Sequence, residues 1–151
     1  MLHVALWEPE IPPNTGNIAR ICAATETRLH LIGRLGFHID DRTVKRAGLD
    51  YWPHVDLVQH TTWNEFLAAM PEARIWLIDN PAERSYTQVQ YQDGDVLVFG
   101  SETRGLPERI RTDAAERLLS IPMSSAHVRS LNLSNSVGIV LYEALRQIRS
   151  W

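Results

Sequence analysis

Three segments gather hydroxyl, amide and charged side chains around or beside glycines, a composition that suits the binding of a polar ligand. They are "NTGNIAR" (14–20), "FGSETRGLP" (99–107) and "RSLNLSNS" (129–136). Arg20 carries a permanent positive charge, and Glu102 supplies a carboxylate. Ser130 and Asn132 offer donors and acceptors that can hold a ribose, a carboxylate or a phosphate. The residue types therefore indicate a site for a ligand that carries one of these groups.

Each segment also has a purely structural interpretation, which the residues alone leave open. The first can be a capped helix with a solvated Arg20, and the second can be a surface turn. Ser134 can cap the helix that follows the third segment. A cap does not explain why Arg129, Ser130 and Asn132 precede it.

Several common catalytic signatures are absent from the sequence. The stretch "GSETRG" (100–105) matches neither the GxGxxG fingerprint nor a phosphate-binding loop that contains Gly-Lys-Ser/Thr. There is no GxSxG elbow, and the six histidines show no HExxH spacing. Cys22 is the single cysteine, which argues against an internal disulfide and a cysteine-based metal site. We therefore expect no metal, and we interpret the histidines as core or surface residues.

The composition is that of one folded domain, with 151 residues of which 44% are hydrophobic. No apolar run approaches the roughly 18 residues of a membrane span, and the N-terminus shows no signal-peptide pattern. We therefore expect a cytoplasmic protein without a membrane partner. The net charge of −3 gives no overall attraction to nucleic acid. Arginine outnumbers lysine, which suits RNA recognition, although genomic base composition is the simpler explanation of that bias.

Hydrophobic periodicity predicts strands that alternate with helices along the chain. We expect strands at 2–7, 29–33, 74–78, 95–100 and 118–121. We expect helices at 14–27 with Asn14 or Thr15 as the cap, at 41–48 ending at Gly48, at 62–70 and at 134–149. The last helix has a buried stripe of Val137, Val140, Leu141, Ala144, Leu145 and Ile148. This alternation favours an α/β fold in which helices cover both faces of a parallel sheet.

Three of the predicted strands end in the same unusual way. They run into "LIDNP" (77–81), "FGSETRGLP" (99–107) and "SIPMSSAHVRSLNLS" (120–134), which are rich in Gly, Pro, Ser, Asn and charge. In parallel α/β sheets, ligands bind beyond the carboxyl ends of the strands. We therefore expect the three exits to line one pocket, largely with backbone groups.

Taken together, the segments resemble the three motifs of the SPOUT RNA methyltransferases. The resemblance lies in "NTGNIAR", "FGSETRGLP" and "IPMSSAHVRSLNLSNSVGIVLYEALRQ", and it covers nearly the whole chain. The opening "EPEIPPNTGNIAR" is most similar to the small members that act on the wobble nucleotide of tRNA. The resemblance implies 2′-O-methylation of cytidine or uridine 34 in the anticodon loop, with S-adenosylmethionine as cofactor. It also implies a deep trefoil knot at the C-terminal end of the fold, and a homodimer.

The resemblance further implies roles for particular residues. Cofactor binding falls on Leu77, Ile78, Gly100, Gly105, Ile121, Met123, Ser130 and Leu131. The catalytic group is Arg20, Asn17, Glu102, Ser130 and Asn132. RNA contacts are expected from Arg20, Arg46, Arg104 and Arg129. Arg20 is expected beside the ribose hydroxyl, with Asn17 holding it and with Glu102 or a phosphate oxygen accepting the proton. The first and last helices, including Tyr142 and Arg146, are the expected dimer face.

Three other functions remain open from the sequence. The first is 2′-O-methylation of another tRNA site or of ribosomal RNA, although such enzymes usually carry an additional RNA-binding domain. The second is a knotted RNA-binding factor without catalysis, which has no need for an intact "FGSETRGLP" (99–107). The third is a dinucleotide-dependent α/β enzyme, which the missing GxGxxG disfavours.

Overall fold

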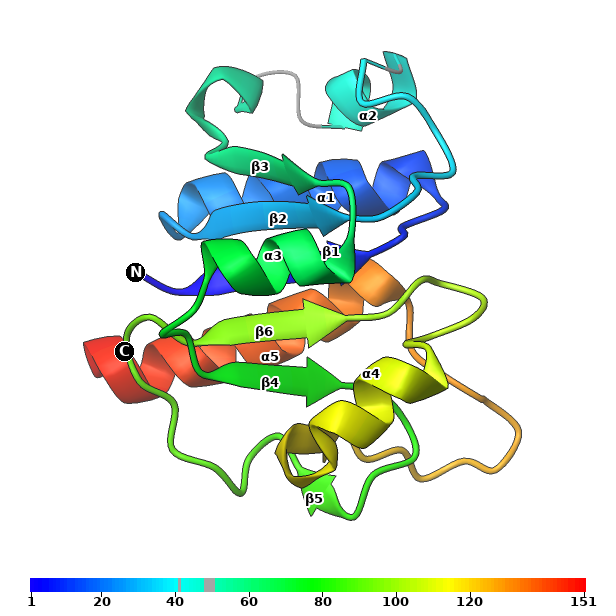
Figure 1. Cartoon of the computed structure of the whole chain (residues 1–151), viewed down its shortest axis with the longest axis vertical. Coiled ribbons are helices and arrows are strands. Elements are labelled where there is room, and N and C mark those ends of the chain that lie inside the picture. The colour runs from blue at the N-terminus through cyan, green and yellow to red at the C-terminus, as the bar shows by residue number, and fades with distance from the viewer. Residues whose placement is uncertain (41, 48–50) are drawn as a thin grey trace.

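The computed structural model describes residues 1–40, 42–47 and 51–151. Across these residues the chain builds a seven-stranded sheet in the order β3-β2-β1-β6-β4-β7-β5, and all its strand pairs are parallel (Figure 1). The strands are β1 (His3–Trp7), β2 (Arg28–Ile32), β3 (Leu57–His60), β4 (Ile75–Ile78), β5 (Arg84–Ser85), β6 (Val96–Phe99) and β7 (Leu118–Ser120). The expected parallel α/β sheet is confirmed.

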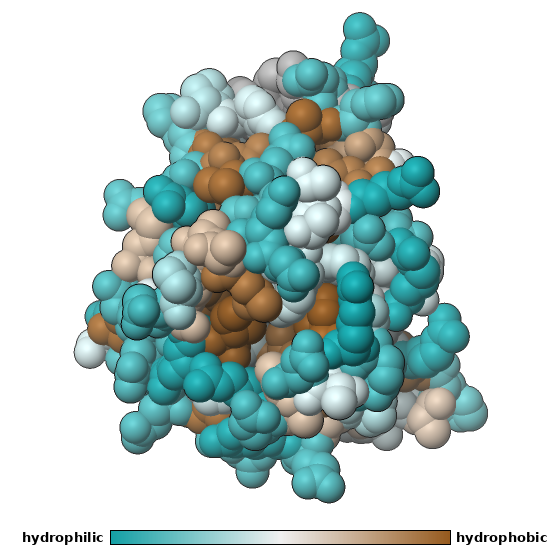
Figure 2. Space-filling model, viewed as in Figure 1, coloured by the Kyte–Doolittle hydropathy of each residue, from teal (hydrophilic) through white to brown (hydrophobic). Residues whose placement is uncertain are grey.

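Helices cover both faces of this sheet. They are α1 (Pro12–Ala24), α2 (Arg42–Ala47), α3 (Trp63–Ala69), α4 (Glu108–Asp113) and α5 (Leu133–Arg149), with short 3-10 turns at Trp52–His54 and Ala115–Arg117. In Figure 1, α3 and α4 lie in front of the sheet, and α1 and α5 lie behind it. On the front face, hydrophobic areas are separated by hydrophilic side chains (Figure 2).

Alternate residues of β1 show why the sheet needs a helical layer on each side. Val4 and Leu6 belong to the hydrophobic cluster that contains the buried residues of α1 and α5. Ala5 and Trp7 belong to a second cluster with the buried residues of α3 and α4. All four are buried, as the inner strands of a doubly covered parallel sheet must be.

Helix α1 begins earlier than expected, which changes the position of its polar residues. Ile11 is the N-cap residue, Pro12 and Pro13 occupy the first helical turn, and the helix ends at Ala24. Proline is tolerated in the first helical turn because the N–H groups there have no intrahelical partner. The prediction that Asn14 or Thr15 caps the helix is therefore wrong. Asn14 lies inside the first turn and is buried, which frees its side chain for a tertiary contact.

Helix α5 confirms the predicted stripe but not the predicted cap. Five of the six stripe residues are buried, and Ile148 packs partly buried against the same cluster. Asn132, not Ser134, is the N-cap, because its side-chain oxygen accepts hydrogen bonds from the backbone N–H groups of Ser134 and Asn135. Amide and hydroxyl side chains compete for this role, and the residue two places earlier takes it here.

The sequence patterns missed the short elements β3, β5 and α4. β3 has four residues of mostly intermediate burial, and β5 has only two. α4 has six residues, and Ile110 is its one buried residue. Elements this short carry too few turns or alternations to produce a period. The predicted end of the second helix at Gly48 lies outside the described residues. Within the described part of the chain, no helix is long and apolar enough to cross a membrane.

Three of the six histidines form a row across the neighbouring strands β1, β2 and β3. His30 of β2 shares one hydrogen bond of 2.9 Å with His3 of β1 and another of 2.9 Å with His60 of β3. All three rings are buried, and Phe66 of α3 packs edge-on against His30 and His60. Burial lowers the pKa of His30 to about 3 and lowers those of His3 and His60 below their usual value. The row is therefore a neutral part of the core.

Candidate active site

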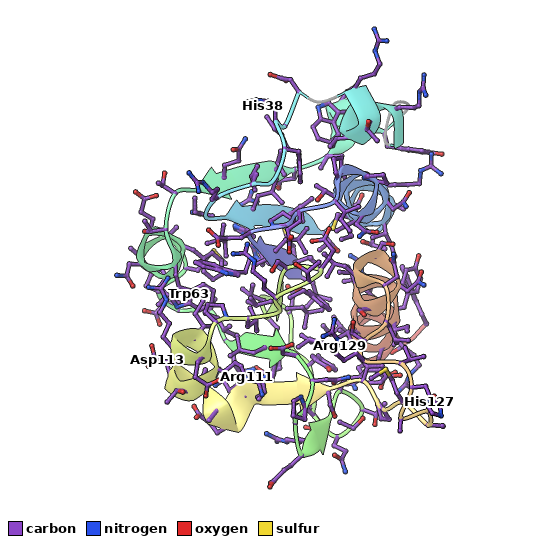
Figure 3. All side chains as sticks on the ribbon, turned by 90° about the vertical axis from the view of Figure 1, so that its right-hand side faces the viewer. His38, Trp63, Arg111, Asp113, His127 and Arg129 are labelled. Atoms are coloured by element: carbon purple, nitrogen blue, oxygen red, sulfur yellow. The ribbon has the colours of Figure 1, made fainter. Side chains whose placement is uncertain are left out.

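A cavity of about 520 Å³ lies at the carboxyl ends of β4, β6 and β7. The three strand exits that the sequence singled out supply most of its wall, as expected. Figure 3 looks at the edge of the sheet where these strands end, and it shows Arg111 on the α4 side and Arg129 on the α5 side. The volume falls in the range that suits a small cofactor.

The loop after β6 folds back on itself at the cavity. The backbone N–H of Ser101 donates to the carbonyl of Gly105 at 3.3 Å, and the N–H of Gly105 donates back at 2.9 Å. A Cβ at Gly100 would clash with the backbone of Gly105 and Leu106, so this position requires glycine. Gly105 itself has a φ of +65°, which also favours glycine. The glycines therefore serve first to fold the loop, and the folded loop exposes its backbone to the cavity.

The carboxylate of Glu102, in this loop, binds the start of α1. Its Oε1 accepts a hydrogen bond of 2.8 Å from the backbone N–H of Glu10, and its Oε2 accepts one of 2.7 Å from that of Ile11. Oε2 also accepts from the side-chain amide of Asn14 at 3.3 Å. A carboxylate at a helix N-terminus satisfies free N–H groups and interacts favourably with the helix dipole. Glu102 therefore joins the cavity loop to α1.

Asn14 extends this connection to the third motif. The side-chain amide of Asn132 donates a hydrogen bond of 3.1 Å to Oδ1 of Asn14. Asn14, Glu102 and Asn132 thus form one network that joins the three motif segments. Sequence reasoning missed Asn14 as a site residue because it was assigned the role of a cap. The available signal was that it is the first polar residue of "NTGNIAR" (14–20).

A second set of contacts joins the same two loops. The backbone N–H and the hydroxyl of Thr103 donate to the Glu10 carboxylate, the hydroxyl at 2.7 Å. These hydrogen bonds lower the pKa of Glu10 below its usual value. Arg104 lies 3.7 Å from Glu8 and 3.9 Å from Glu10, with 63% of its side chain exposed. Two nearby carboxylates thus offset part of the charge that Arg104 would present to RNA.

The predicted Asn17–Arg20 pair does not form. Both side chains are exposed on α1, but the guanidinium of Arg20 lies over the ring of Tyr51, 4.8 Å from its centroid. A guanidinium is attracted to the face of an aromatic ring, and its N–H groups stay free for other partners. Arg46 of α2 is also exposed. Within the described residues, neither Arg20 nor Arg46 lines the cavity.

Most of the predicted cofactor residues do line the cavity. Those that line it are Ile78, Gly100, Gly105, Ile121, Ser130 and Leu131, and Glu102, Arg104 and Arg129 join them. Leu77 does not, because it points into the core on the α3 and α4 side of the sheet. Met123 is half-buried and lies outside the lining, as do Asn17 and Asn132. Asn132 instead reaches the cavity wall indirectly, through Asn14 and Glu102.

The arrangement suits a ligand with a flat apolar part and several polar groups. Ile78, Leu106 and Ile121 supply apolar surface, and Ser101 and Ser130 supply hydroxyl groups. The charged residues of the wall are of both signs: Asp79, Glu102, Glu108, Arg104, Arg111 and Arg129. No group of three or more histidine, cysteine or acidic side chains within the described ranges could hold a metal ion. A nucleoside cofactor matches this combination of surfaces.

Comparison with known proteins places the chain among RNA-modifying enzymes. A family profile described as the SpoU rRNA Methylase family matches residues 1–142. The tRNA (cytidine(34)-2'-O)-methyltransferase of Escherichia coli (strain K12) is 49% identical over 150 residues, which cover 98% of this chain and 94% of that one. The tRNA (cytidine(34)-2'-O)-methyltransferase of Methylovorus glucosotrophus (strain SIP3-4) is 47% identical, covering 97% of this chain and 96% of that one.

Solved structures agree with these relatives. A structure that gives insights into the 2-OH methylation of C/U34 on tRNA is 47% identical and has a TM-score of 0.95, covering 100% of this chain and 98% of that one. An rRNA methyltransferase from Sinorhizobium meliloti with bound AdoMet is 25% identical and has a TM-score of 0.86. That comparison covers 96% of this chain and 56% of the other.

Proposed function

The chain belongs to the SpoU rRNA methylase family, and from that premise we propose that it methylates the ribose 2′-hydroxyl of nucleotide 34 in tRNA. Relatives that match nearly the whole chain carry this activity in their names. The observation that carries the proposal is the network of Glu102, Asn14 and Asn132, which brings the three motifs together beside one cofactor-sized cavity.

The cavity residues fit S-adenosylmethionine as the cofactor. Ile78, Ile121 and Leu131 provide apolar wall for an adenosine, and the folded loop from Gly100 to Gly105 presents backbone groups. The cofactor supplies an electrophilic methyl group that is already attached to a good leaving group. The protein therefore needs to position the ribose hydroxyl and help it lose its proton. Positioning of this kind contributes up to roughly 7–11 kcal/mol in favourable cases.

Arg20 is the residue that we assign to the ribose and its neighbouring phosphate. Its guanidinium is exposed, permanently charged and pre-oriented by Tyr51, so it can bind a phosphate bidentately. It cannot act as a base, because it does not deprotonate in proteins. Arg20 therefore orients the hydroxyl and stabilises the negative charge that develops on its oxygen.

The proton acceptor that the geometry favours is a phosphate oxygen of the tRNA. Both carboxylate oxygens of Glu102 already accept hydrogen bonds from the start of α1. Because these contacts occupy both oxygens and tie them to α1, they hold the carboxylate away from a role as a mobile base. Glu102 acts instead as a positioning residue, which fixes α1 and Arg20 relative to the cofactor loop.

We further propose that the C-terminal segment forms the trefoil knot typical of the SPOUT fold. The close match to family structures supports it, with a TM-score of 0.95 to the structure that gives insights into the 2-OH methylation of C/U34 on tRNA. So does the gathering of the loops after β4, β6 and β7 around one cavity. A knot of this kind would hold these loops together without help from the cofactor.

A homodimer completes the proposed enzyme. Ile139 and Tyr142 of α5 are 37% and 46% exposed, and Tyr142 contacts the ring of Trp151, which is 58% exposed. Contiguous exposed aromatic and aliphatic groups are typical of an interface. Arg20 lies outside the cavity of its own chain, so each complete site is expected to combine groups from both subunits. Arg146 pairs with Glu143 at 2.9 Å and would contribute at the rim.

The tRNA anticodon loop would bind in single-stranded form, with its bases accessible to stacking. Arg46, Arg104 and Arg129 are exposed or line the cavity, so they are the proposed phosphate contacts together with Arg20. With tRNA as its substrate, the enzyme is proposed to work in the cytoplasm.

The direct test is methyl transfer from labelled S-adenosylmethionine to total tRNA of a strain that lacks this protein. Label in 2′-O-methylcytidine or 2′-O-methyluridine is the expected result. Label that enters ribosomal RNA but not tRNA would overturn the proposed substrate and would indicate the other known activity of the family.

A further inference from the structure

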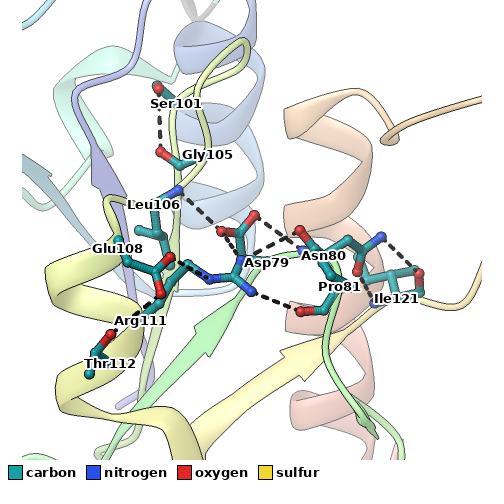
Figure 4. A network of polar contacts seen from close by, with 10 residues as sticks. All are labelled: Asp79, Asn80, Pro81, Ser101, Gly105, Leu106, Glu108, Arg111, Thr112 and Ile121. Carbon is teal, nitrogen blue, oxygen red and sulfur yellow. Dashed lines mark hydrogen bonds and ion pairs between the residues drawn. The ribbon is translucent and has the colours of Figure 1, made fainter.

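We propose that Asp79 and Arg111 form a positioning pair that holds the three loops of the cofactor cavity in their binding arrangement. Asp79 follows β4 and Arg111 lies in α4, and both line the cavity. The inference rests on the proposed function only in that S-adenosylmethionine is taken as the ligand. Figure 4 shows the pair at the centre of a network of polar contacts.

Asp79 connects the loop after β4 to the loop after β6. Its Oδ2 accepts a hydrogen bond of 2.7 Å from Nη1 of Arg111 and one of 3.3 Å from the backbone N–H of Leu106. Oδ1 accepts from the backbone N–H of Asn80 at 3.1 Å. A Cβ on Gly105 would lie 3.0 Å from the same Oδ1, so the carboxylate lies directly against the glycine turn. Asp79 therefore fixes where that turn lies.

The guanidinium of Arg111 binds backbone carbonyls of the loop after β4 as well as the carboxylate of Asp79. While Nη1 binds Asp79, it also approaches the carbonyl of Asn80 at 3.4 Å. Nη2 donates to the carbonyl of Pro81 at 2.9 Å. One planar guanidinium thus contacts three consecutive residues, which a lysine ammonium could not do in the same geometry. Arg111 anchors all of them to α4.

Asn80 carries the connection on to the third loop. Its side-chain amide donates to the carbonyl of Ile121 at 3.4 Å, and its Oδ1 accepts from the N–H of Ile121 at 3.3 Å. Ile121 lines the cavity directly after β7. Asp79 accepts from the backbone N–H of Asn80, and Arg111 donates to its backbone carbonyl, so the pair helps to fix the position of Asn80. The pair therefore controls all three walls of the cavity.

The burial of the pair makes its effect on binding substantial. The side chains of Asp79 and Arg111 are 18% and 19% exposed, so water screens their attraction less than at an open surface. A ligand that binds loops already in place does not lose free energy in ordering them. Because the pair touches the cofactor walls and not the ribose site, it should affect cofactor binding more than the chemical step.

The test compares Asp79→Asn and Arg111→Met with the double variant and with Arg109→Met as the control. Arg109 lies on the same helix but stacks over Trp7 and does not line the cavity. Calorimetry with S-adenosylmethionine gives the Kd, and methyl transfer to tRNA gives KM for the cofactor and kcat. Arg111→Lys, which keeps the charge, serves as the second variant where another substitution prevents folding.

We expect each single substitution to raise both Kd and KM for the cofactor about tenfold, with kcat at saturating cofactor within about twofold. The double variant should be no weaker than the worse single variant, because the two residues act as one unit. Arg111→Lys should lie between the wild type and Arg111→Met, and Arg109→Met should match the wild type. The proposed pair would be overturned by wild-type cofactor affinity in the single variants. It would also be overturned if the fold-increases in Kd of the two single variants multiplied in the double variant. A wild-type protein that does not bind S-adenosylmethionine would instead overturn the proposed function.

Discussion

The side-chain amide of Asn132 donates a hydrogen bond of 3.1 Å to Oδ1 of Asn14, joining residues that are 118 positions apart in the chain. Asn132 is also the N-cap of α5, and Asn14 lies in the first turn of α1. The starts of both helices are therefore fixed relative to each other and, through Glu102, to the cavity loop. This arrangement gives the enzyme a rigid frame on which Arg20 and the cofactor can be positioned.

Replacing Arg20 with alanine should reduce turnover far more than cofactor affinity. Arg20 is assigned to charge that develops during the reaction, so kcat should fall about 100-fold or more. The Kd for S-adenosylmethionine should stay within about twofold, because Arg20 does not line the cavity. Single-turnover methyl transfer and calorimetry measure the two quantities.

The matched control is Arg109→Ala, which removes another exposed arginine that stacks on an aromatic ring. It should leave kcat unchanged. Equal losses of turnover and cofactor affinity in Arg20→Ala would contradict the role assigned to Arg20.

Replacing Glu102 with glutamine should lower both stability and activity. The glutamine NH₂ group would face N–H donors at the start of α1, so one hydrogen bond is lost and a donor remains unpaired. The free energy of unfolding should fall by about 1–3 kcal/mol. Urea unfolding measures this loss, with Glu108→Gln as the control because that carboxylate is 87% exposed.

The same variant separates the two roles considered for Glu102. As a positioning residue, Glu102 contributes to stability and does not set the pH dependence of the rate. If Glu102→Gln kept full stability while the fall in rate at low pH disappeared, Glu102 would be the proton acceptor after all.

The row of His3, His30 and His60 should make the protein less stable in mild acid. Burial holds the pKa of His30 at about 3, against an ordinary value of 6.5. The neutral form is thus favoured in the folded state, and stability is fully present above pH 6.5 and is lost as the pH falls from there toward 3. The loss for each such histidine is at most about 1.4 kcal/mol per pH unit.

Urea unfolding at pH 7.5 and pH 5 tests this dependence. Nearby charges oppose one another, because Arg28 and the N-terminus lower the pKa of His3 while Asp56 and Asp93 raise it, and Glu65 raises that of His60. Because these charges also affect how stability changes with pH, the contribution of His30 is isolated by comparing His30→Gln with the wild type at each pH. It should lose less stability on acidification, whereas His127→Gln, at an exposed site, should behave as the wild type. If all three proteins lost the same free energy of unfolding between pH 7.5 and pH 5, buried His30 would not be a cause of the acid sensitivity.

Much of the fold was predictable because the long elements have strong periods. The stripe of α5 and the apolar runs of β1 and β6 specify a helix and buried strands without help from the rest of the chain. β3, β5 and α4 are short, and their existence depends on neighbours that the sequence pattern does not reveal. The N-cap of α5 was misplaced because Asn132 and Ser134 can both cap a helix. The start of α1 was misplaced because Ile11 caps it without a side-chain hydrogen bond, and two prolines fill the first turn.

The sequence predicted which segments line the site. It did not predict which side chains of those segments contact one another. The exits at Ile78, Gly100 and Ile121 do line one cavity. Asn14 was interpreted as a helix cap because its actual partners, Glu102 and Asn132, are 88 and 118 residues away. Asp79 and Arg111 were missed for the same reason, since 32 residues separate them. Long-range polar pairs leave no local period, so only the folded structure shows them.

Replacing Tyr142 with glutamate should produce a monomer without methyl transfer. The substitution places a charge in the exposed group of Ile139, Tyr142 and Trp151, which is the proposed interface. Light scattering after size-exclusion chromatography measures the mass. The control is Leu67→Glu, which charges a side chain of similar exposure, 36%, on α3. A dimer that persists in Tyr142→Glu, or activity in a proven monomer, would contradict the proposed assembly.

The most direct test of the proposed function uses anticodon stem-loops with a single 2′-deoxy substitution. Labelled S-adenosylmethionine is supplied to stem-loops that carry the deoxyribose at nucleotide 34 or, as the matched control, at nucleotide 33 or 35. Methyl transfer should disappear only with the substitution at 34. Continued transfer to the stem-loop that lacks the 2′-hydroxyl at 34 would contradict it.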